Sequence, residues 1–154
     1  MKFNIEYFYY LFIFLFNIFI VFYYYFELKL DKFIPEKIYK LYIFSSITCI
    51  LLFLIFIYYL FINDNFNKIT INKIYYAIFI MLYSLMYWII SCYYQCEILN
   101  ILFVLCIIIS NIYLLFIVYN INEKKYKTIK NLSIIAILYL LFHHIYIDLF
   151  LWNY

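Results

Sequence analysis

The sequence contains no glycine and no arginine, only one proline, Pro35, and few charged residues, which make up 12% of its 154 positions. Phosphate-binding loops, dinucleotide-binding fingerprints and the sharp nucleophile turn of hydrolases all need glycine, so these classes of site are excluded. The glycine motif that packs membrane helices closely is also missing. The absence of arginine removes the bidentate clamp that proteins use for phosphate and carboxylate groups.

Apolar residues, in contrast, make up 71% of the chain, and aromatic residues alone make up 28%. Soluble domains are about 45–50% apolar and about 25% charged. A small folded domain leaves a large part of its surface in contact with solvent, so a soluble fold of this length could not hide so much apolar side chain. The low charge and the many aromatics equally exclude a disordered chain. The composition therefore predicts an integral membrane protein.

Five apolar segments approach the length of about 20 residues that an α-helix needs to cross a bilayer. They run over residues 5–26, 41–62, 74–91, 98–119 and 132–152. The links between them are short and polar, and the cluster SCYYQCE at Ser91–Glu97 predicts a tight hairpin turn between the third and fourth segments. We therefore expect an all-α fold in which residues 1–154 form a single membrane domain with about five spanning helices and no soluble domain.

The lysines predict the orientation of these spans. Seven of the lysines fall on the N-terminal side of the five-span topology and four on the other side. By the positive-inside rule, the N-terminus then faces the cytoplasm or the mitochondrial matrix. The first span is preceded neither by an arginine- and serine-rich transit peptide nor by a cleavable signal. We expect the chain to keep Met1 and to be made inside the organelle that houses it.

Two histidines, His143 and His144, are adjacent within the fifth predicted span. Ionisable residues at membrane depth are candidates for a function, and haem ligation or proton relay suits histidine. Adjacent residues of a helix point about 100° apart, so the pair cannot hold one haem from both faces. The structural interpretation, which we favour, is a pair of neutral imidazoles that bond to a neighbouring helix or to lipid headgroups.

Two acidic residues complete the set of catalytic candidates. Asp148 lies four positions after His144 and so on the same helical face, where the two could relay a proton. A solvated helix end is the interpretation we favour for Asp148. Glu97 falls in the predicted hairpin turn, which indicates a place at the membrane surface. We assign no catalytic residue and keep His143, His144, Asp148 and Glu97 as candidates.

The cysteines give no metal motif. The spacing of Cys92 and Cys96 differs from the metal-binding pattern with two intervening residues, and two thiols do not complete a tetrahedral zinc site. A disulfide between these two cysteines is an open alternative. Cys49 and Cys106 lie within predicted spans, where a free thiol behaves as a small apolar side chain. We expect no metal, no cofactor of the protein's own and no binding of nucleic acid.

Other polar residues indicate contacts rather than chemistry. Four lysines in the last link fit anionic lipid, such as phospholipid or cardiolipin, or an acidic protein partner, with a merely solvated loop as the alternative. They are Lys124, Lys125, Lys127 and Lys130. Polar side chains at membrane depth usually hydrogen-bond between helices. Those predicted to do so are Asn17, Ser45, Ser46, Thr48, Ser84, Asn100, Ser110 and Asn111.

The residue bias has a direction, because Phe, Tyr, Met, Ile, Asn and Lys account for 100 of the 154 residues. A+T-rich codons encode these residues, which indicates an organelle genome or a very A+T-rich nuclear genome. Runs such as FYYLFIFLFNIFIVFYYYF, together with links rich in Asn and Lys, resemble the small, strongly diverged membrane proteins of A+T-rich protist mitochondrial genomes, notably those of ciliates.

That resemblance implies a non-catalytic structural or assembly subunit of a respiratory-chain complex in the mitochondrial inner membrane, with other membrane subunits as partners. NADH dehydrogenase and cytochrome c oxidase are the complexes that it favours. Such a chain is not an enzyme on its own. Two alternatives stay open: a diverged core subunit that relays protons or ligates haem, and a free-standing membrane protein that handles lipids or ions.

Overall fold

The computed structural model describes residues 36–63, 68–122 and 124–151, and these residues are almost entirely helical. The helices are α2 (Glu36–Ile62), α3 (Lys68–Tyr93), α4 (Glu97–Asn120) and α5 (Lys127–Phe142), and α5 continues without a break into η2, a π-helix over His143–Leu151. The described residues contain no strand. The all-α prediction is therefore confirmed for this part of the chain.

Four of the predicted spans correspond to helices that are long and apolar enough to cross a membrane, at Tyr39–Leu60, Ile69–Tyr93, Glu97–Asn120 and Lys127–Leu149. The third and fifth helices begin several residues earlier than the predicted segments at 74 and 132. Lysine has a high helix propensity, and its long side chain can place the charge in water from a helical turn at the membrane interface. The lysines before the apolar segments can therefore belong to the helices. The predicted span at residues 5–26 and Asn17 lie outside the described residues, so four helices that could cross a membrane are shown and a fifth is not.

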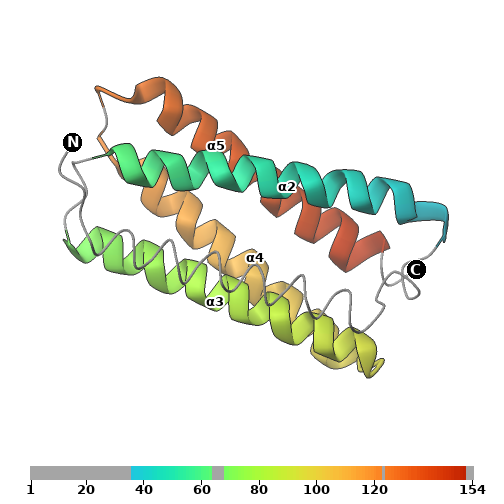
Figure 1. Cartoon of the computed structure of the whole chain (residues 1–154). Coiled ribbons are helices and arrows are strands. Elements are labelled where there is room, and N and C mark those ends of the chain that lie inside the picture. Colours follow the sequence, from blue (N-terminus) through green and yellow to red (C-terminus); the bar gives the residue numbers. More distant parts are fainter. Residues whose placement is uncertain (1–35, 64–67, 123, 152–154) are drawn as a thin grey trace.

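The helices pack as an antiparallel bundle (Figure 1). α3 packs most extensively on α4, α2 packs on α5, and α4 joins the two pairs through α5. One end of the bundle therefore gathers the start of α2, the α3–α4 turn and η2, and we refer to it as the hairpin end (Figure 1). The opposite end gathers the end of α2, the start of α3, the end of α4 and the start of α5 (Figure 1).

The α3–α4 turn falls within the SCYYQCE cluster, as the sequence predicts, because α3 ends at Tyr93 and α4 begins at Glu97. Gln95 takes a left-handed conformation with φ of 54°. Its backbone N–H donates to the Cys92 carbonyl at 3.1 Å, and that of Cys96 donates to the Ser91 carbonyl at 3.0 Å. This is a Schellman motif, in which glycine is the usual left-handed residue. In a chain without glycine, glutamine takes that place.

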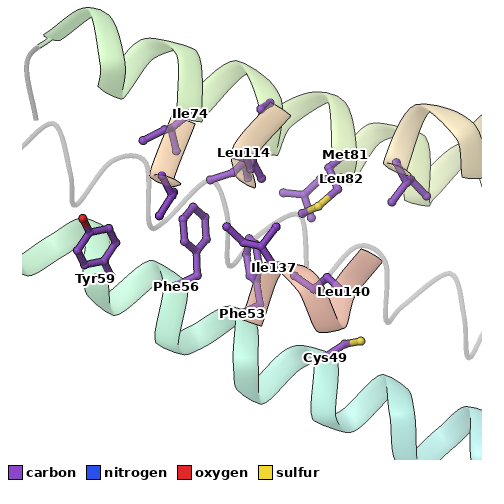
Figure 2. Packing of buried hydrophobic residues seen from close by; sticks show 14 residues of the cluster. Cys49, Phe53, Phe56, Tyr59, Ile74, Met81, Leu82, Leu114, Ile137 and Leu140 are labelled. Carbon is purple, nitrogen blue, oxygen red and sulfur yellow. The ribbon is translucent and has the colours of Figure 1, made fainter. Parts of the chain in front are cut away.

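Side-chain packing at the centre of the bundle joins α2, α3, α4 and α5 in one apolar cluster. Phe56 of α2, Leu114 of α4 and Ile137 of α5 are each 0% exposed and belong to one apolar cluster (Figure 2). Lipid tails are as apolar as these side chains, so close packing rather than exclusion of water holds membrane helices together. The two alanines of the chain, Ala77 and Ala136, are both buried, at sites where a small side chain lets helices approach closely.

The outward faces of α2 and α4 carry large apolar side chains. On α2 these are Phe44, Ile47, Leu51, Leu54 and Tyr58. On α4 they are Ile98, Leu102, Leu105, Ile109, Ile112 and Phe116. Their spacing of three or four residues is that of one helical face, so each helix presents a continuous apolar strip outward. In a membrane, these strips meet lipid or the helices of other proteins.

Candidate functional site

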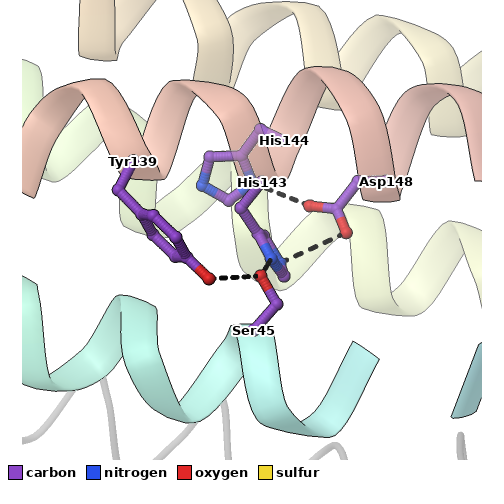
Figure 3. Close-up of polar contacts among 5 residues, drawn as sticks. All are labelled: Ser45, Tyr139, His143, His144 and Asp148. Carbon is purple, nitrogen blue, oxygen red and sulfur yellow. Dashed lines mark hydrogen bonds and ion pairs between the residues drawn. The ribbon is translucent and has the colours of Figure 1, made fainter. Parts of the chain in front are cut away.

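The three titratable residues of η2 lie together inside the bundle, near the hairpin end (Figure 3). His143, His144 and Asp148 are 4%, 7% and 2% exposed. All three fall within the segment Lys127–Leu149, which is long and apolar enough to cross a membrane. We refer to these three residues as the His–Asp cluster. It brings together three of the four catalytic candidates that the sequence analysis retained.

A continuous line of polar contacts runs through the cluster (Figure 3). His144 Nδ1 lies 2.7 Å from Asp148 Oδ2, and His143 Nε2 lies 3.5 Å from the other carboxylate oxygen, Oδ1. On its opposite edge, the His143 ring places Nδ1 2.8 Å from Ser45 Oγ of α2. The Ser45 hydroxyl is in turn 3.2 Å from the Tyr139 hydroxyl of α5. The line thus joins Tyr139 to His144 and ties α2 to the end of the last helix.

The π-helix explains how one carboxylate reaches both histidines. In an α-helix, residues four apart share a face, but residues five apart are separated by about 140° around the axis. Asp148 is four residues from His144 and five from His143. A π-helix has wider turns with bonds from residue i to i+5, so both spacings fall on one side. π-Helical turns inside α-helices are often found at functional sites.

The burial of Asp148 corrects the interpretation of this residue as a solvated helix end. Its side chain is 1% exposed and its carboxylate contacts both histidines. Residues of α2 and of α4 both pack against η2. The sequence shows that Asp148 lies near the end of the last span, but it does not show which helices cover it.

The remaining candidate, Glu97, does not join the cluster. It is the first residue of α4 and is exposed at the hairpin turn, where the sequence analysis placed it.

The lysines of the last link lie at the opposite end of the bundle from the cluster (Figure 1). Lys124, Lys125 and Lys127 are exposed, and Lys125 Nζ lies 4.8 Å from the centre of the Tyr126 ring. Lys130 is half-buried and donates to the carbonyl oxygens of Tyr119 and Ile121, at the end of α4. There it satisfies carbonyls that have no partner within the helix. Of the four lysines, Lys130 thus contacts the bundle through its ammonium group, and the other three are exposed at the surface.

Other polar side chains divide into two groups. Ser91 contacts Asn100 across the α3–α4 turn, which is an interhelical contact of the kind predicted. Thr48, Ser110 and Asn111 instead donate to the carbonyl four residues earlier in their own helices. The four cysteines all lie in the described ranges and are free thiols, so the alternative of a Cys92–Cys96 disulfide is wrong.

The sequence analysis missed Ser45 as the partner of His143, and Tyr139 as the partner of Ser45. Ser45 appeared there only as a packing residue and Tyr139 not at all, because nothing in the sequence pairs α2 with α5. The resulting arrangement suits two kinds of chemistry. Alternating hydroxyl, imidazole and carboxylate groups can pass protons between them. One ring nitrogen from each histidine and a carboxylate oxygen lie within 4.8 Å of one another, which suits a metal ion.

Similarity to known proteins does not distinguish between proton transfer and metal binding at this cluster. Comparisons of the chain with protein-family models, with curated proteins and with solved structures find no match.

Proposed function

We propose that this chain is a non-catalytic structural subunit in the membrane part of a mitochondrial respiratory complex, with NADH dehydrogenase and cytochrome c oxidase as the favoured candidates. The proposal is carried by one observation, the separation of polar side chains inside the bundle from apolar side chains on its outward faces. The polar groups at membrane depth described above bond to one another or to their own helices, inside the bundle. The outward faces of α2 and α4 are apolar along their length.

This separation of polar and apolar side chains suits a helix bundle that functions by packing against neighbouring subunits. Apolar faces on two helices of the bundle can contact neighbouring subunits by close packing, as membrane helices do. The bond between Ser45 and His143 fixes α2 against the last helix, which holds the two helices in one register. The respiratory assignment itself rests on the A+T-driven residue bias and its resemblance to diverged mitochondrial membrane subunits.

The proposed location is the mitochondrial inner membrane, with the N-terminus toward the matrix. Lys73 near the start of α3 is exposed, as are Lys124, Lys125 and Lys127 near the start of α5. The starts of α3 and α5 lie at the same end of the bundle (Figure 1). A lysine-rich end facing the matrix agrees with the positive-inside rule. The three exposed lysines beside α5 would contact anionic headgroups such as those of cardiolipin.

Loss of this chain is expected to lower the assembly of one respiratory complex and to leave the others intact, because a packing subunit stabilises the partners that it contacts. Cells depleted of the chain are solubilised mildly, and the amount of each assembled complex is measured by native electrophoresis. Depletion followed by re-expression is the control. Normal amounts of every complex without the chain would contradict the proposal.

A second candidate function is favoured by the His–Asp cluster itself, namely a proton relay within a diverged core subunit. Its test is the triple variant His143→Leu, His144→Phe and Asp148→Leu, which removes every titratable group of the cluster. If these groups carry protons, the complex assembles but its turnover falls at least about tenfold, as for loss of a general acid or base. Full turnover in an assembled complex would exclude the relay.

A further inference from the structure

The geometry of the His–Asp cluster points to a metal site, and we propose that His143, His144 and Asp148 bind one divalent transition-metal ion of the zinc class. The three residues offer two imidazole nitrogens and a carboxylate oxygen within 4.8 Å of one another. Two nitrogen ligands with one carboxylate suit zinc, copper, iron or nickel better than magnesium or calcium, which prefer oxygen ligands. The proposal goes beyond the structural role given above and does not depend on it.

The first supporting observation is a buried oxygen without a donor. Asp148 Oδ1 is buried, and it has no hydrogen-bond partner among the described residues. His143 Nε2 lies 3.5 Å from this oxygen without forming a hydrogen bond to it. A buried carboxylate oxygen without a partner is costly, and at membrane depth its charge needs an opposite charge nearby. A cation between Oδ1 and the His143 ring would meet both needs.

The second observation is the contact on the far edge of the His143 ring. When Nδ1 of a neutral histidine carries the proton and donates a hydrogen bond to an oxygen, Nε2 keeps a free lone pair. That lone pair can bind a metal ion. Ser45 Oγ, at 2.8 Å from His143 Nδ1, is placed to accept that hydrogen bond. The Ser45 hydroxyl can then donate to Tyr139, 3.2 Å away. The Ser45 hydroxyl therefore supplies for His143 the outer hydrogen bond that metal-binding histidines nearly always have.

The three ligand atoms lie within 4.8 Å of one another, which is wider than in a zinc-bound site but within reach of side-chain rotation. Tetrahedral zinc with bonds of about 2.1 Å holds its ligand atoms about 3.4 Å apart. At present each histidine contacts a different carboxylate oxygen, His144 Nδ1 at 2.7 Å from Asp148 Oδ2 and His143 Nε2 at 3.5 Å from Oδ1. Rotation of the imidazole rings would bring all three atoms to the metal. Three protein ligands leave a fourth position for water or a small ligand, as in catalytic zinc sites.

Zinc binding by the full chain tests the proposal directly. The protein is purified in detergent, stripped with a chelator and titrated with Zn²⁺, and bound metal is measured by mass spectrometry after removal of free ion. We expect about one Zn²⁺ per chain, as for a single structural or catalytic site. No stoichiometric binding by the unsubstituted chain would overturn the proposal, and this outcome would leave the assembly experiment unaffected.

Matched variants locate the bound metal. Asp148→Asn and His144→Gln are expected to weaken zinc binding at least about 100-fold, since each removes one of three ligands. Glu97→Gln makes the same change from acid to amide at an exposed position, and it should bind zinc as the unsubstituted chain does. Helical content by circular dichroism is recorded for every variant. Equal loss of binding in Glu97→Gln and Asp148→Asn would overturn the assignment.

Two further variants separate the proposed site from other sources of binding. Ser45→Ala keeps all three ligands but removes the oxygen that accepts from His143, so affinity should fall about tenfold while about one Zn²⁺ still binds. Unchanged affinity in Ser45→Ala would contradict the positioning of His143 by this hydroxyl. Zinc that stays bound in Asp148→Asn but leaves when Cys96 is replaced by Ser would place the metal on a thiol and overturn the proposal.

Discussion

The double variant His143→Leu with His144→Phe is expected to lose about 1–3 kcal/mol of unfolding free energy, the cost of leaving a buried polar group without its hydrogen-bond partner. The two substitutions remove both groups that contact the Asp148 carboxylate. That side chain is 1% exposed, so its charge would stay in the bundle without a partner. Unfolding of the full chain is followed by circular dichroism in mixed micelles as the fraction of denaturing detergent rises.

The triple variant that adds Asp148→Leu is the matched control. It removes the charge together with its partners, and replacing a whole buried polar group by apolar residues is often nearly neutral. We therefore expect the third substitution to restore most of the lost stability, although it changes a further side chain of the core. A triple variant as unstable as the double variant would show that the loss comes from packing of the rings, and it would contradict the electrostatic explanation.

Phe56→Ala is expected to cost about 3 kcal/mol, near the low end of the values measured when a core phenylalanine is truncated. Phe56 is 0% exposed and belongs to the cluster that joins α2, α3, α4 and α5 (Figure 2). Its removal leaves a cavity whose lining loses contacts on one side. The value falls near the low end because lipid tails solvate a phenylalanine about as well as the bundle does.

Phe44→Ala supplies the comparison within the same helix. Phe44 also lies on α2, but it is 69% exposed on the outward face. In the isolated chain this substitution should change the unfolding free energy by less than about 0.5 kcal/mol, as surface substitutions usually do. Both variants are measured by the same detergent titration. Equal losses for Phe44→Ala and Phe56→Ala would mean that α2 does not pack with the face that the structure assigns to the core.

The spans and the turn between α3 and α4 could be predicted because each depends on local sequence. A run of about 20 apolar residues is itself the condition for crossing a bilayer. The cluster SCYYQCE interrupts two such runs, and the helices break there. The residues at which α3 and α5 begin could not be predicted as well, because lysines near the start of a helix can lie in its interfacial turn as well as in a loop.

The His–Asp cluster could be predicted only in part. The i+4 spacing of His144 and Asp148 placed them on one face of a helix, and the structure brings them to 2.7 Å. The contact between His143 and Asp148 needs the wider turn of a π-helix. The α-helical period does not place residues five apart on one face, so the sequence does not predict this contact. The burial of Asp148 and the part played by Ser45 depend on which helices pair. In a chain whose helices are apolar on nearly every face, the sequence does not determine that pairing.

The most direct test of the proposed function is the size at which the chain migrates. Membranes are solubilised mildly and separated under native conditions, and mass spectrometry then follows this chain across the size range. Co-migration with one respiratory complex, and with its known membrane subunits, is the result predicted for a packing subunit. Migration of the chain alone at small size would contradict that role and would favour a free-standing membrane protein.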